Sequence, residues 1–388
     1  MGVDIDTLAV HAGRSEFSEL TVHAPPIDLS TTYPLPDLDE AVADLEALAR
    51  GEASASNPIY SRLHNPTVRR FESALAELEH TEDAVAFSSG MAALAGVLLG
   101  TCGERRHLVA LRPLYGGTDH LLACGLLGIE VTWVQSAAEV ATAVRNETGL
   151  VLLETPQNPT LGVVNIAEVL AASGDVPVLV DNTFATPVLQ NPADHGAAFV
   201  LHSATKFLGG HGDVLAGVVA ASADRAARLR QVRILTGAVL HPLAAYLLHR
   251  SLPTLPFRVR LAQERAGVLA ERLSGHPQVT RVLYPKPDGV QLRGAGAVLA
   301  FEVAGGIDAA ARVLGALRLV TPAVSLGSTD TLIQHPAGLT HRLVDERVKA
   351  ELGITDGLLR LSAGLENADD LWADLEQALA AGHLRAAA

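Results

Sequence analysis

The residue types best suited to covalent chemistry gather around Lys206, one of only three lysines in the 388-residue chain. Lys206 follows an apolar run and the hydroxyl residues Ser203 and Thr205, and a glycine-rich loop comes directly after it. The other two lysines lie in different settings, Lys286 in a turn with prolines and a glycine, and Lys349 on a charged helical face. An amine beside hydroxyls and flexible backbone suits a Schiff base to an aldehyde cofactor that bears a phosphate. The alternative interpretation is a solvated loop lysine.

Two further polar positions occur where buried strands are expected to end. The segment Ser88-Ser89-Gly90-Met91 joins a short apolar run to a helix, and the free N–H groups at a helix N-terminus favour a phosphate. An ordinary N-cap serine is the alternative there. Asp181 ends the apolar run 177–180, where an ionised carboxylate could hold a pyridine nitrogen protonated and make the ring an electron sink. A turn aspartate is the alternative. Ser203 and Thr205 could add hydroxyl donors to the phosphate.

A lone cation and a lone aromatic residue complete the candidate site. Arg360 lies in the apolar stretch 357–364, and a buried arginine needs an anionic partner. An amino-acid carboxylate or a structural ion pair would supply that anion. Tyr115 lies in a glycine loop and could stack on a cofactor ring. The sequence contains no G-x-G-x-x-G, Walker, G-x-S-x-G or H-E-x-x-H pattern, so we expect no metal site.

The composition is that of a globular protein with an acidic charge balance. Hydrophobic residues make up 48% and charged residues 19% of the chain. The net charge of −14 (29 Lys and Arg less 43 Asp and Glu) comes without a basic run, which argues against nucleic acids and anionic membranes as partners. The apolar runs are far shorter than the roughly 18 to 20 residues that cross a bilayer. Without a signal-peptide pattern, and with only two cysteines, the sequence predicts a cytoplasmic protein.

Short apolar runs alternate with helical patterns through the middle of the chain. The expected strands are 84–87, 107–111, 130–134, 150–154, 177–181 and 198–202. Helices are expected between several of them, and the segment 67–79 places Phe71, Leu75 and Leu78 on one helical face. This alternation indicates an α/β domain with a mostly parallel sheet, whose ligands bind at the carboxyl ends of the strands.

The chain divides into an arm and two domains. Residues 1–64 form an irregular N-terminal arm with one amphipathic helix near 38–49, and an arm of this length suits contact with a neighbouring subunit. Residues 65–253 form the α/β domain, in which the chain is expected to turn helical after Gly217. Residues 254–388 form a smaller C-terminal α+β domain.

These motifs together resemble the pyridoxal-phosphate enzymes of cysteine and methionine metabolism, a family that includes cystathionine γ-synthase, the cystathionine γ- and β-lyases and methionine γ-lyase. The resemblance runs from about Leu8 to Ala380. It is carried by Tyr60-Ser-Arg62, Asn65-Pro-Thr67, Ser88-Ser-Gly-Met91, Glu154-Thr-Pro-Gln-Asn-Pro-Thr160, Val180-Asp-Asn-Thr-Phe-Ala-Thr-Pro187, His202-Ser-Ala-Thr-Lys206, Gly210-His-Gly-Asp213, Ser325-Leu-Gly327 and Arg360-Leu-Ser362.

The resemblance implies the fold-type I architecture of pyridoxal-phosphate-dependent transferases and a homotetramer of two active dimers. It implies that Lys206 is the Schiff-base lysine and that Tyr115 stacks on the cofactor and acts as an acid or base for the leaving group. Tyr60 and Arg62 would reach the cofactor from the neighbouring subunit. The implied cofactor-binding residues are Tyr60, Arg62, Ser89, Gly90, Met91, Tyr115, Asp181, Thr183, Ser203, Thr205 and Lys206. The implied substrate-binding residues are Asn158, Ser325 and Arg360.

Within the family, segments 236–242 and 332–341 look most like methionine γ-lyases, which implies γ-elimination of L-methionine to α-ketobutyrate, ammonia and methanethiol. Gly117 departs from that pattern, because those enzymes carry a cysteine there and cystathionine enzymes often carry a glycine. Asp330 stands where the family usually has a glutamate associated with cystathionine binding. Cystathionine γ-lyase or γ-synthase is therefore the alternative reaction. A cofactor-free binding protein of the same fold is the alternative from a different class.

Overall fold

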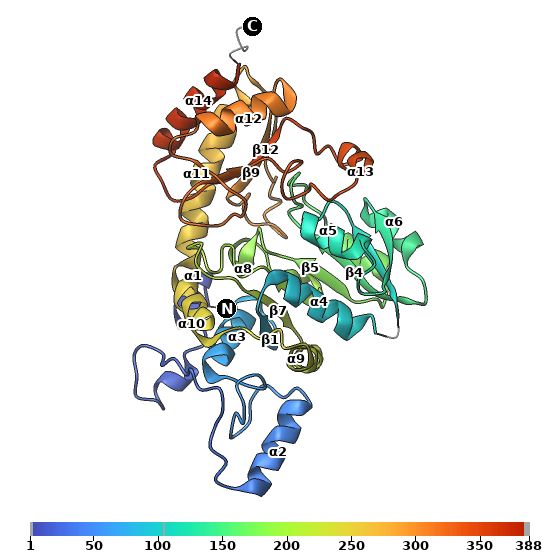
Figure 1. Cartoon of the computed structure of the whole chain (residues 1–388), viewed down its shortest axis with the longest axis vertical. Coiled ribbons are helices and arrows are strands. Elements are labelled where there is room, and N and C mark those ends of the chain that lie inside the picture. The colour runs from blue at the N-terminus through green and yellow to red at the C-terminus, as the bar shows by residue number, and fades with distance from the viewer. Residues whose placement is uncertain (1–2, 104, 384–388) are drawn as a thin grey trace.

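A computed structural model describes residues 3–103 and 105–383, and it contains a larger and a smaller β-sheet (Figure 1). In the described part of the chain, the larger sheet has seven strands in the order β1-β7-β6-β5-β4-β2-β3. Their bounds are Asp83–Phe87 (β1), His107–Leu111 (β2), Glu130–Val134 (β3), Thr148–Glu154 (β4), Val178–Asp181 (β5), Phe199–His202 (β6) and Gly217–Ala221 (β7). All neighbours pair in parallel except β7, which is antiparallel to both β1 and β6. The prediction of a mostly parallel sheet is confirmed.

Helices cover both faces of the larger sheet, which explains why its central strands are mostly apolar and end in polar residues only at the edge that faces the cavity. One face packs against α4 (Gly90–Thr101), α5 (Gly116–Ala123) and α9 (Ala223–Thr236). The other face packs against α3 (Pro66–Leu78), α6 (Ala137–Ala143), α7 (Ile166–Ser173), α8 (Thr186–Leu189) and α10 (Pro242–Ser251). In α3, Phe71, Leu75 and Leu78 are fully buried, as the helical pattern predicted.

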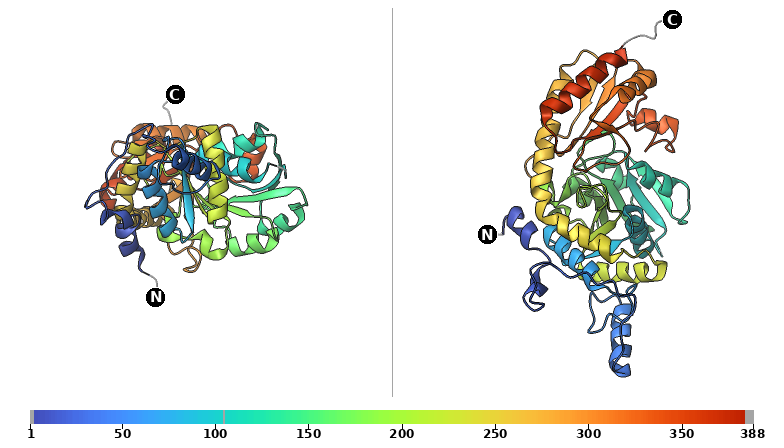
Figure 2. Two further views of the ribbon diagram at one scale, coloured as in Figure 1. Left: turned by 90° about the horizontal axis from the view of Figure 1, so that it is seen from below. Right: turned by 60° about the vertical axis from the view of Figure 1, so that its left-hand side comes forward.

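The smaller sheet lies beside the carboxyl ends of the larger one and has the order β10-β11-β12-β9-β8. Its strands are Val279–Leu283 (β8), Val298–Val303 (β9), Thr321–Pro322 (β10), Leu332–Gln334 (β11) and Leu358–Ser362 (β12). Helices α12 (Gly306–Ala316) and α14 (Ala368–His383) cover it, and α13 (Glu346–Glu351) lies apart (Figure 1). The long helix α11 (Leu255–Ser274) packs on the larger sheet's core at its start and on the smaller sheet's core at its end (Figure 2). It begins close to the predicted domain boundary at 253/254, which stays a prediction.

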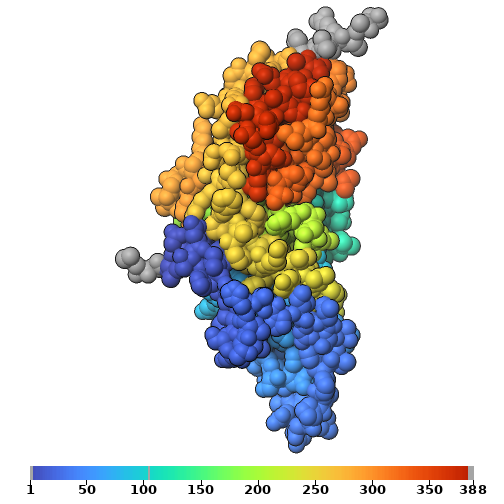
Figure 3. Space-filling view, turned by 90° about the vertical axis from the view of Figure 1, so that its left-hand side faces the viewer, coloured from blue at the N-terminus to red at the C-terminus, as the bar shows by residue number. Residues whose placement is uncertain are grey.

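Among residues 3–64, α2 (Leu38–Ala49) projects from the rest of the molecule (Figure 3), and the assignment of this region as an arm stays a prediction. Helix α2 matches the expected helix, whereas α1 (Ile5–His11) and the short turn Ser15–Phe17 were not predicted. Several large apolar side chains of the arm are exposed in the single chain, including Leu29 and Leu38. No helix in residues 3–103 and 105–383 is long and apolar enough to cross a membrane.

The chain turns helical only at Ala223, where α9 begins, because residues Gly217–Ala221 form strand β7, which the sequence did not predict. A short apolar run does not by itself distinguish a strand from a buried helix, and β7 is decided by its partners β1 and β6. A glycine is required where β7 begins, because a Cβ on Gly217 would lie 2.1 Å from the Ser89 carbonyl oxygen. This close approach sets the start of β7 against the first turn of α4.

Truncating Phe71 to alanine is expected to lower the free energy of unfolding by roughly 3 to 5 kcal/mol, because it leaves a cavity in the core between α3 and the sheet. Phe257, on α11, is 68% exposed and serves as the matched control. Its replacement by alanine should change the free energy by no more than about 0.5 kcal/mol. Denaturant unfolding of both variants at one protein concentration measures this, and equal losses would contradict the assigned core.

Candidate active site

A cavity of about 600 Å³ opens between the two sheets at the carboxyl ends of β4, β5 and β6. The N-terminus of α4 closes one side, and residues from the smaller sheet and its loops close the other. The predicted site residues that line it are Ser89, Gly90, Met91, Tyr115, Asn158, Asp181, Thr183, Ser203, Thr205, Lys206, Ser325 and Arg360. The fold thus brings together side chains that are up to 271 positions apart (Arg360 less Ser89).

Lys206 lies in the turn after β6 and points into the cavity. Its Nζ donates a hydrogen bond to Ser325 Oγ at 2.6 Å, and its backbone N–H bonds to the Ser203 carbonyl. Burial and the nearby Arg360 guanidinium lower the pKa of Lys206 to about 8. The alternative of a solvated loop lysine does not fit this environment. A partly desolvated amine of lowered pKa is a better nucleophile and base near neutral pH.

Two carboxyl groups stand side by side at the ends of adjacent strands, Asp181 on β5 and Glu154 directly opposite it on β4. The Thr183 hydroxyl and backbone N–H both donate to Asp181 Oδ1, at 2.5 and 3.0 Å. Burial raises the pKa of Asp181, against these hydrogen bonds. Burial, and then the charge of Asp181, raises the pKa of Glu154 well above its usual range. Both shifts favour the protonated acid, and the shift is the stronger one at Glu154.

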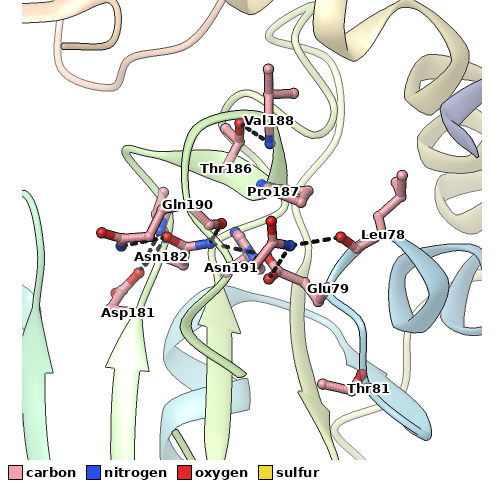
Figure 4. Close-up of polar contacts among 12 residues, drawn as sticks. Leu78, Glu79, Thr81, Asp181, Asn182, Thr186, Pro187, Val188, Gln190 and Asn191 are labelled. Atoms are coloured by element: carbon pink, nitrogen blue, oxygen red, sulfur yellow. Dashed lines mark hydrogen bonds and ion pairs between the residues drawn. The ribbon is translucent and has the colours of Figure 1, made fainter. Parts of the chain in front are cut away.

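The backbone behind Asp181 is held by a buried polar network (Figure 4). The Asn182 amide donates to Glu79 Oε1 and to the Gln190 carbonyl, both at 3.0 Å. Asn191 donates to the Leu78 carbonyl at 2.8 Å. The neighbouring His202 bonds to Glu79 at 2.6 Å, so its ring is engaged in this network. These buried hydrogen bonds fix the end of β5, which carries Asp181, and the loop that follows it.

The first turn of α4 meets the loop after β6 in a cradle suited to a phosphate. Ser89 is an N-cap, since its Oγ accepts from the Ala92 N–H, and it also lines the cavity. A Cβ on Gly90 would lie 3.0 Å from the Ser203 Cβ, so a glycine is needed for the approach. The Thr205 hydroxyl donates to the Ala216 carbonyl and accepts from the Ala216 N–H. To donate to a ligand it would give up its bond to that carbonyl. Backbone N–H groups at a helix start are donors for an anion.

Arg360 on β12 is buried and aims at the cavity. Its two terminal nitrogens donate to Asn158 Oδ1 and the Ser325 carbonyl, both at 2.9 Å, and its buried Nε has no hydrogen-bond partner among the described residues. No carboxylate in the described part of the chain lies within 4 Å of the guanidinium, so the ion-pair alternative fails. Burial lowers the pKa of Arg360 to about 10. A carboxylate bound here would gain a charge-assisted pair.

Tyr115 forms one wall of the cavity, and its backbone N–H donates to Glu154 Oε2 at 2.7 Å. A Cβ on Gly117 would lie 2.5 Å from the ring of Tyr115, so the ring rests over that glycine. Asp330 is exposed and does not line the cavity. The cavity of the single chain also excludes Tyr60 and Arg62.

Two residues that the sequence did not single out contact the cavity wall at Leu114 and Tyr115. Glu154 ends a strand beside Asp181 and lines the cavity, so its position at a strand end was the signal that could have identified it. His341 lies in an irregular segment, and its Nε2 bonds to the Leu114 carbonyl at 3.1 Å. Nothing local in the sequence indicates that contact.

His341 predicts a pH dependence of stability. Burial lowers its pKa from 6.5 to about 4, so between these values the unfolded chain takes up a proton that the folded chain does not. Stability therefore falls as pH falls below about 6.5, by roughly 2 kcal/mol from this group between pH 7 and pH 5. His341→Gln does not titrate and should lose correspondingly less stability over that range. Denaturant unfolding of both proteins at the two pH values tests this, and parallel losses would contradict it.

Comparison with known proteins agrees with the site. The sequence matches the family model described as Cys/Met metabolism PLP-dependent enzyme over residues 6–380. It is 56% identical to an L-methionine gamma-lyase of Streptomyces avermitilis, over 98% of this chain and 90% of that protein. It is 55% identical to an L-methionine gamma-lyase of Brevibacterium sandarakinum, over 99% and 98% of the two chains.

Solved structures agree in fold. A cystathionine gamma synthase from Xanthomonas oryzae pv. oryzae superposes with a TM-score of 0.90 at 34% identity, over 98% of this chain and 99% of that one. A cystathionine gamma lyase from Micromonospora echinospora superposes with a TM-score of 0.87 at 37% identity, over 98% and 100%. The predicted fold-type I architecture is confirmed. The chain belongs to the Cys/Met metabolism family of pyridoxal-phosphate-dependent enzymes, and pyridoxal phosphate is its cofactor.

Proposed function

We propose that the chain is a carbon–sulfur lyase that converts L-methionine and water to α-ketobutyrate, ammonia and methanethiol by γ-elimination. The observation that carries the proposal is the meeting of Lys206 and Arg360 in one cavity, an amine of lowered pKa beside a guanidinium without a carboxylate partner among the described residues. The names of relatives at 54 to 56% identity over nearly the whole chain support methionine as the substrate.

Pyridoxal phosphate, when bound, supplies an aldehyde for the substrate amine and a ring that accepts the electrons of a broken Cα–H bond. We assign its phosphate to the cradle of Ser89, Gly90, Met91, Ser203 and Thr205. Asp181, fixed by Thr183, would pair with the ring nitrogen, and Tyr115 would stack on the ring. This pairing requires Asp181 to be the charged member of the carboxyl pair, and it is supported by the two Thr183 hydrogen bonds to Asp181 and by the stronger rise in the pKa of Glu154.

Arg360, Asn158 and Ser325 would bind the amino-acid end of the substrate. The guanidinium already donates to Asn158 and Ser325, so its fork is oriented before a carboxylate arrives. Lys206 would then take the proton from Cα and, after giving that proton up, take a second proton from Cβ. Ser325, whose hydroxyl is the present partner of the Lys206 amine, lies within reach of it. The thiolate would leave from Cγ with a proton from the Tyr115 hydroxyl.

The mouth of the cavity favours an apolar thioether. Leu215, Val324 and Leu339 line it with exposed apolar side chains. Burying a methylthio group against them is favourable, whereas the charged distal end of cystathionine would lose hydration there. Cystathionine γ-lyase or γ-synthase remains the second candidate, because solved structures with those names superpose over nearly the whole chain.

We also propose a cytoplasmic homotetramer of two active dimers. Tyr60 and Arg62 lie outside the cavity of their own chain, and Tyr60 is 44% exposed. The arm that carries them presents exposed apolar side chains that a second copy would bury. Tyr60 and Arg62 would then complete the phosphate cradle of the neighbouring subunit.

A substrate panel tests the reaction. With purified holoenzyme, L-methionine should yield methanethiol and α-ketobutyrate in equal amounts. L-cystathionine, and O-acylhomoserine with cysteine, should react more slowly, because their polar ends meet the apolar mouth. If only cystathionine yields ketobutyrate, the reaction is that of a cystathionine γ-lyase. If O-acylhomoserine and cysteine yield cystathionine, it is that of a cystathionine γ-synthase.

Replacement of Lys206 by alanine is expected to lower kcat by roughly a thousandfold or more, because the site loses its proton-transfer group. It should also abolish the visible absorbance of the covalently held cofactor. Lys286→Ala is the matched control, since Lys286 is exposed in an irregular segment, and it should behave as the parent. A parent chain without that absorbance would favour a cofactor-free binding protein.

A further inference from the structure

The peptide group that joins Leu114 to Tyr115 is held at both of its polar atoms by buried side chains from distant parts of the chain. The Tyr115 N–H donates to Glu154 Oε2 at 2.7 Å, and Glu154 ends β4 of the larger sheet. The Leu114 carbonyl accepts from His341 Nε2 at 3.1 Å, and His341 belongs to the loop after β11 of the smaller sheet. The two contacts fix both the position and the rotation of this peptide plane.

Packing leaves the loop after Tyr115 no room to move toward the smaller sheet. A Cβ on Gly116 would lie 1.9 Å from the Thr340 carbonyl oxygen, so the two backbones touch. Gly117 lies under the Tyr115 ring, where a Cβ would come within 2.5 Å of it. The ring direction is therefore set by the clamped peptide before it and the glycine contact after it.

The hydrogen-bond roles are those of neutral groups. A carbonyl only accepts, so His341 Nε2 must carry a hydrogen. The pKa of His341, about 4 through burial and then through Arg360, leaves the ring uncharged near neutral pH. The groups that face Glu154 are Asp181 on β5, Arg360 on β12 and the Tyr115 loop, and burial with the Asp181 charge raises the pKa of Glu154. An uncharged His341 ring can hold the Leu114 carbonyl without placing a positive charge in this part of the site.

We propose that Glu154 and His341 are positioning residues that together clamp the Leu114–Tyr115 peptide and so aim the Tyr115 ring at the cofactor. The inference rests on the proposed role of Tyr115 in the site. Because His341 comes from the C-terminal part of the chain, the clamp also makes the placement of Tyr115 depend on how the two sheets are seated against each other.

Hydrogen exchange at the Tyr115 amide tests the clamp in the full-length chain, with and without pyridoxal phosphate. Glu154→Leu removes the acceptor, and His341→Asn removes the Nε2 donor while keeping a polar side chain. Each should speed exchange at this amide by roughly tenfold, the effect of losing one buried hydrogen bond. Glu154→Gln keeps an acceptor and His341→Gln keeps a donor near the Nε2 position, so both should retain most of the protection.

The cofactor-loaded proteins give a second measurement. The visible circular dichroism of bound pyridoxal phosphate should shift in Glu154→Leu and His341→Asn, and kcat for methionine should fall by roughly tenfold with a smaller change in KM. The Gln variants should restore both. Gly315→Ala is the control, because Gly315 lies in α12 and nothing lies within 4 Å of an added Cβ.

The outcomes separate the clamp from the reaction. If hydrogen exchange and dichroism in both Glu154→Leu and His341→Asn equal those of the parent, the clamp is overturned. It is also overturned if Glu154→Gln and His341→Gln lose as much amide protection and activity as those two variants. If Glu154→Leu does not fold, the pair His341→Asn and His341→Gln decides alone. If the variants show the expected exchange pattern but the parent protein releases no methanethiol from methionine, the clamp is supported and the proposed function is wrong.

Discussion

Two basic side chains, Lys206 and Arg360, face one partly desolvated cavity, and neither has a carboxylate within 4 Å among the residues that the structure describes. Burying a charge without a counter-ion is costly, and burial accounts for most of the lowering of both pKa values. The fold meets this cost with neutral acceptors, Ser325 Oγ for the amine and Asn158 and the Ser325 carbonyl for the guanidinium. A site built in this way is ready for anionic and carbonyl ligands.

Burial is also costly for the two carboxyl groups at the ends of β4 and β5. Two adjacent buried acids do not both ionise readily, and hydrogen bonds favour the ionised form of the acid that accepts more of them. Asp181 receives two donors from Thr183, whereas Glu154 receives one from the Tyr115 backbone. Glu154 therefore holds the loop of Tyr115, while Asp181 is held by Thr183 at the cavity wall.

Close backbone contacts connect these features to the fold. Gly217 lets β7 pass the first turn of α4, and Gly116 lets the Tyr115 loop touch Thr340. The first contact sets the phosphate cradle, and the second sets the smaller sheet against the larger one. Helix α11, which packs on both cores, holds the two sheets in that relation (Figure 2). The site is therefore a product of how the sheets are seated.

Local pattern in the sequence was sufficient for most elements and for choosing Lys206, Asp181 and Arg360 as candidates that line one cavity, because strand ends, apolar periodicity and lone charges in apolar runs are properties of a few neighbouring residues. The helix at Leu38–Ala49 and the strands at His107–Leu111 and Glu130–Val134 were predicted to the residue. Strand β7 was missed because its identity depends on pairing with β1 and β6, which lie elsewhere in the chain. Glu154 and His341 acquire their roles only through contacts with Tyr115 and Leu114, across 39 and 227 positions. The sequence determined which groups could do chemistry, and the tertiary structure decided which of them meet, because hydrogen bonds and desolvation depend on distance in space.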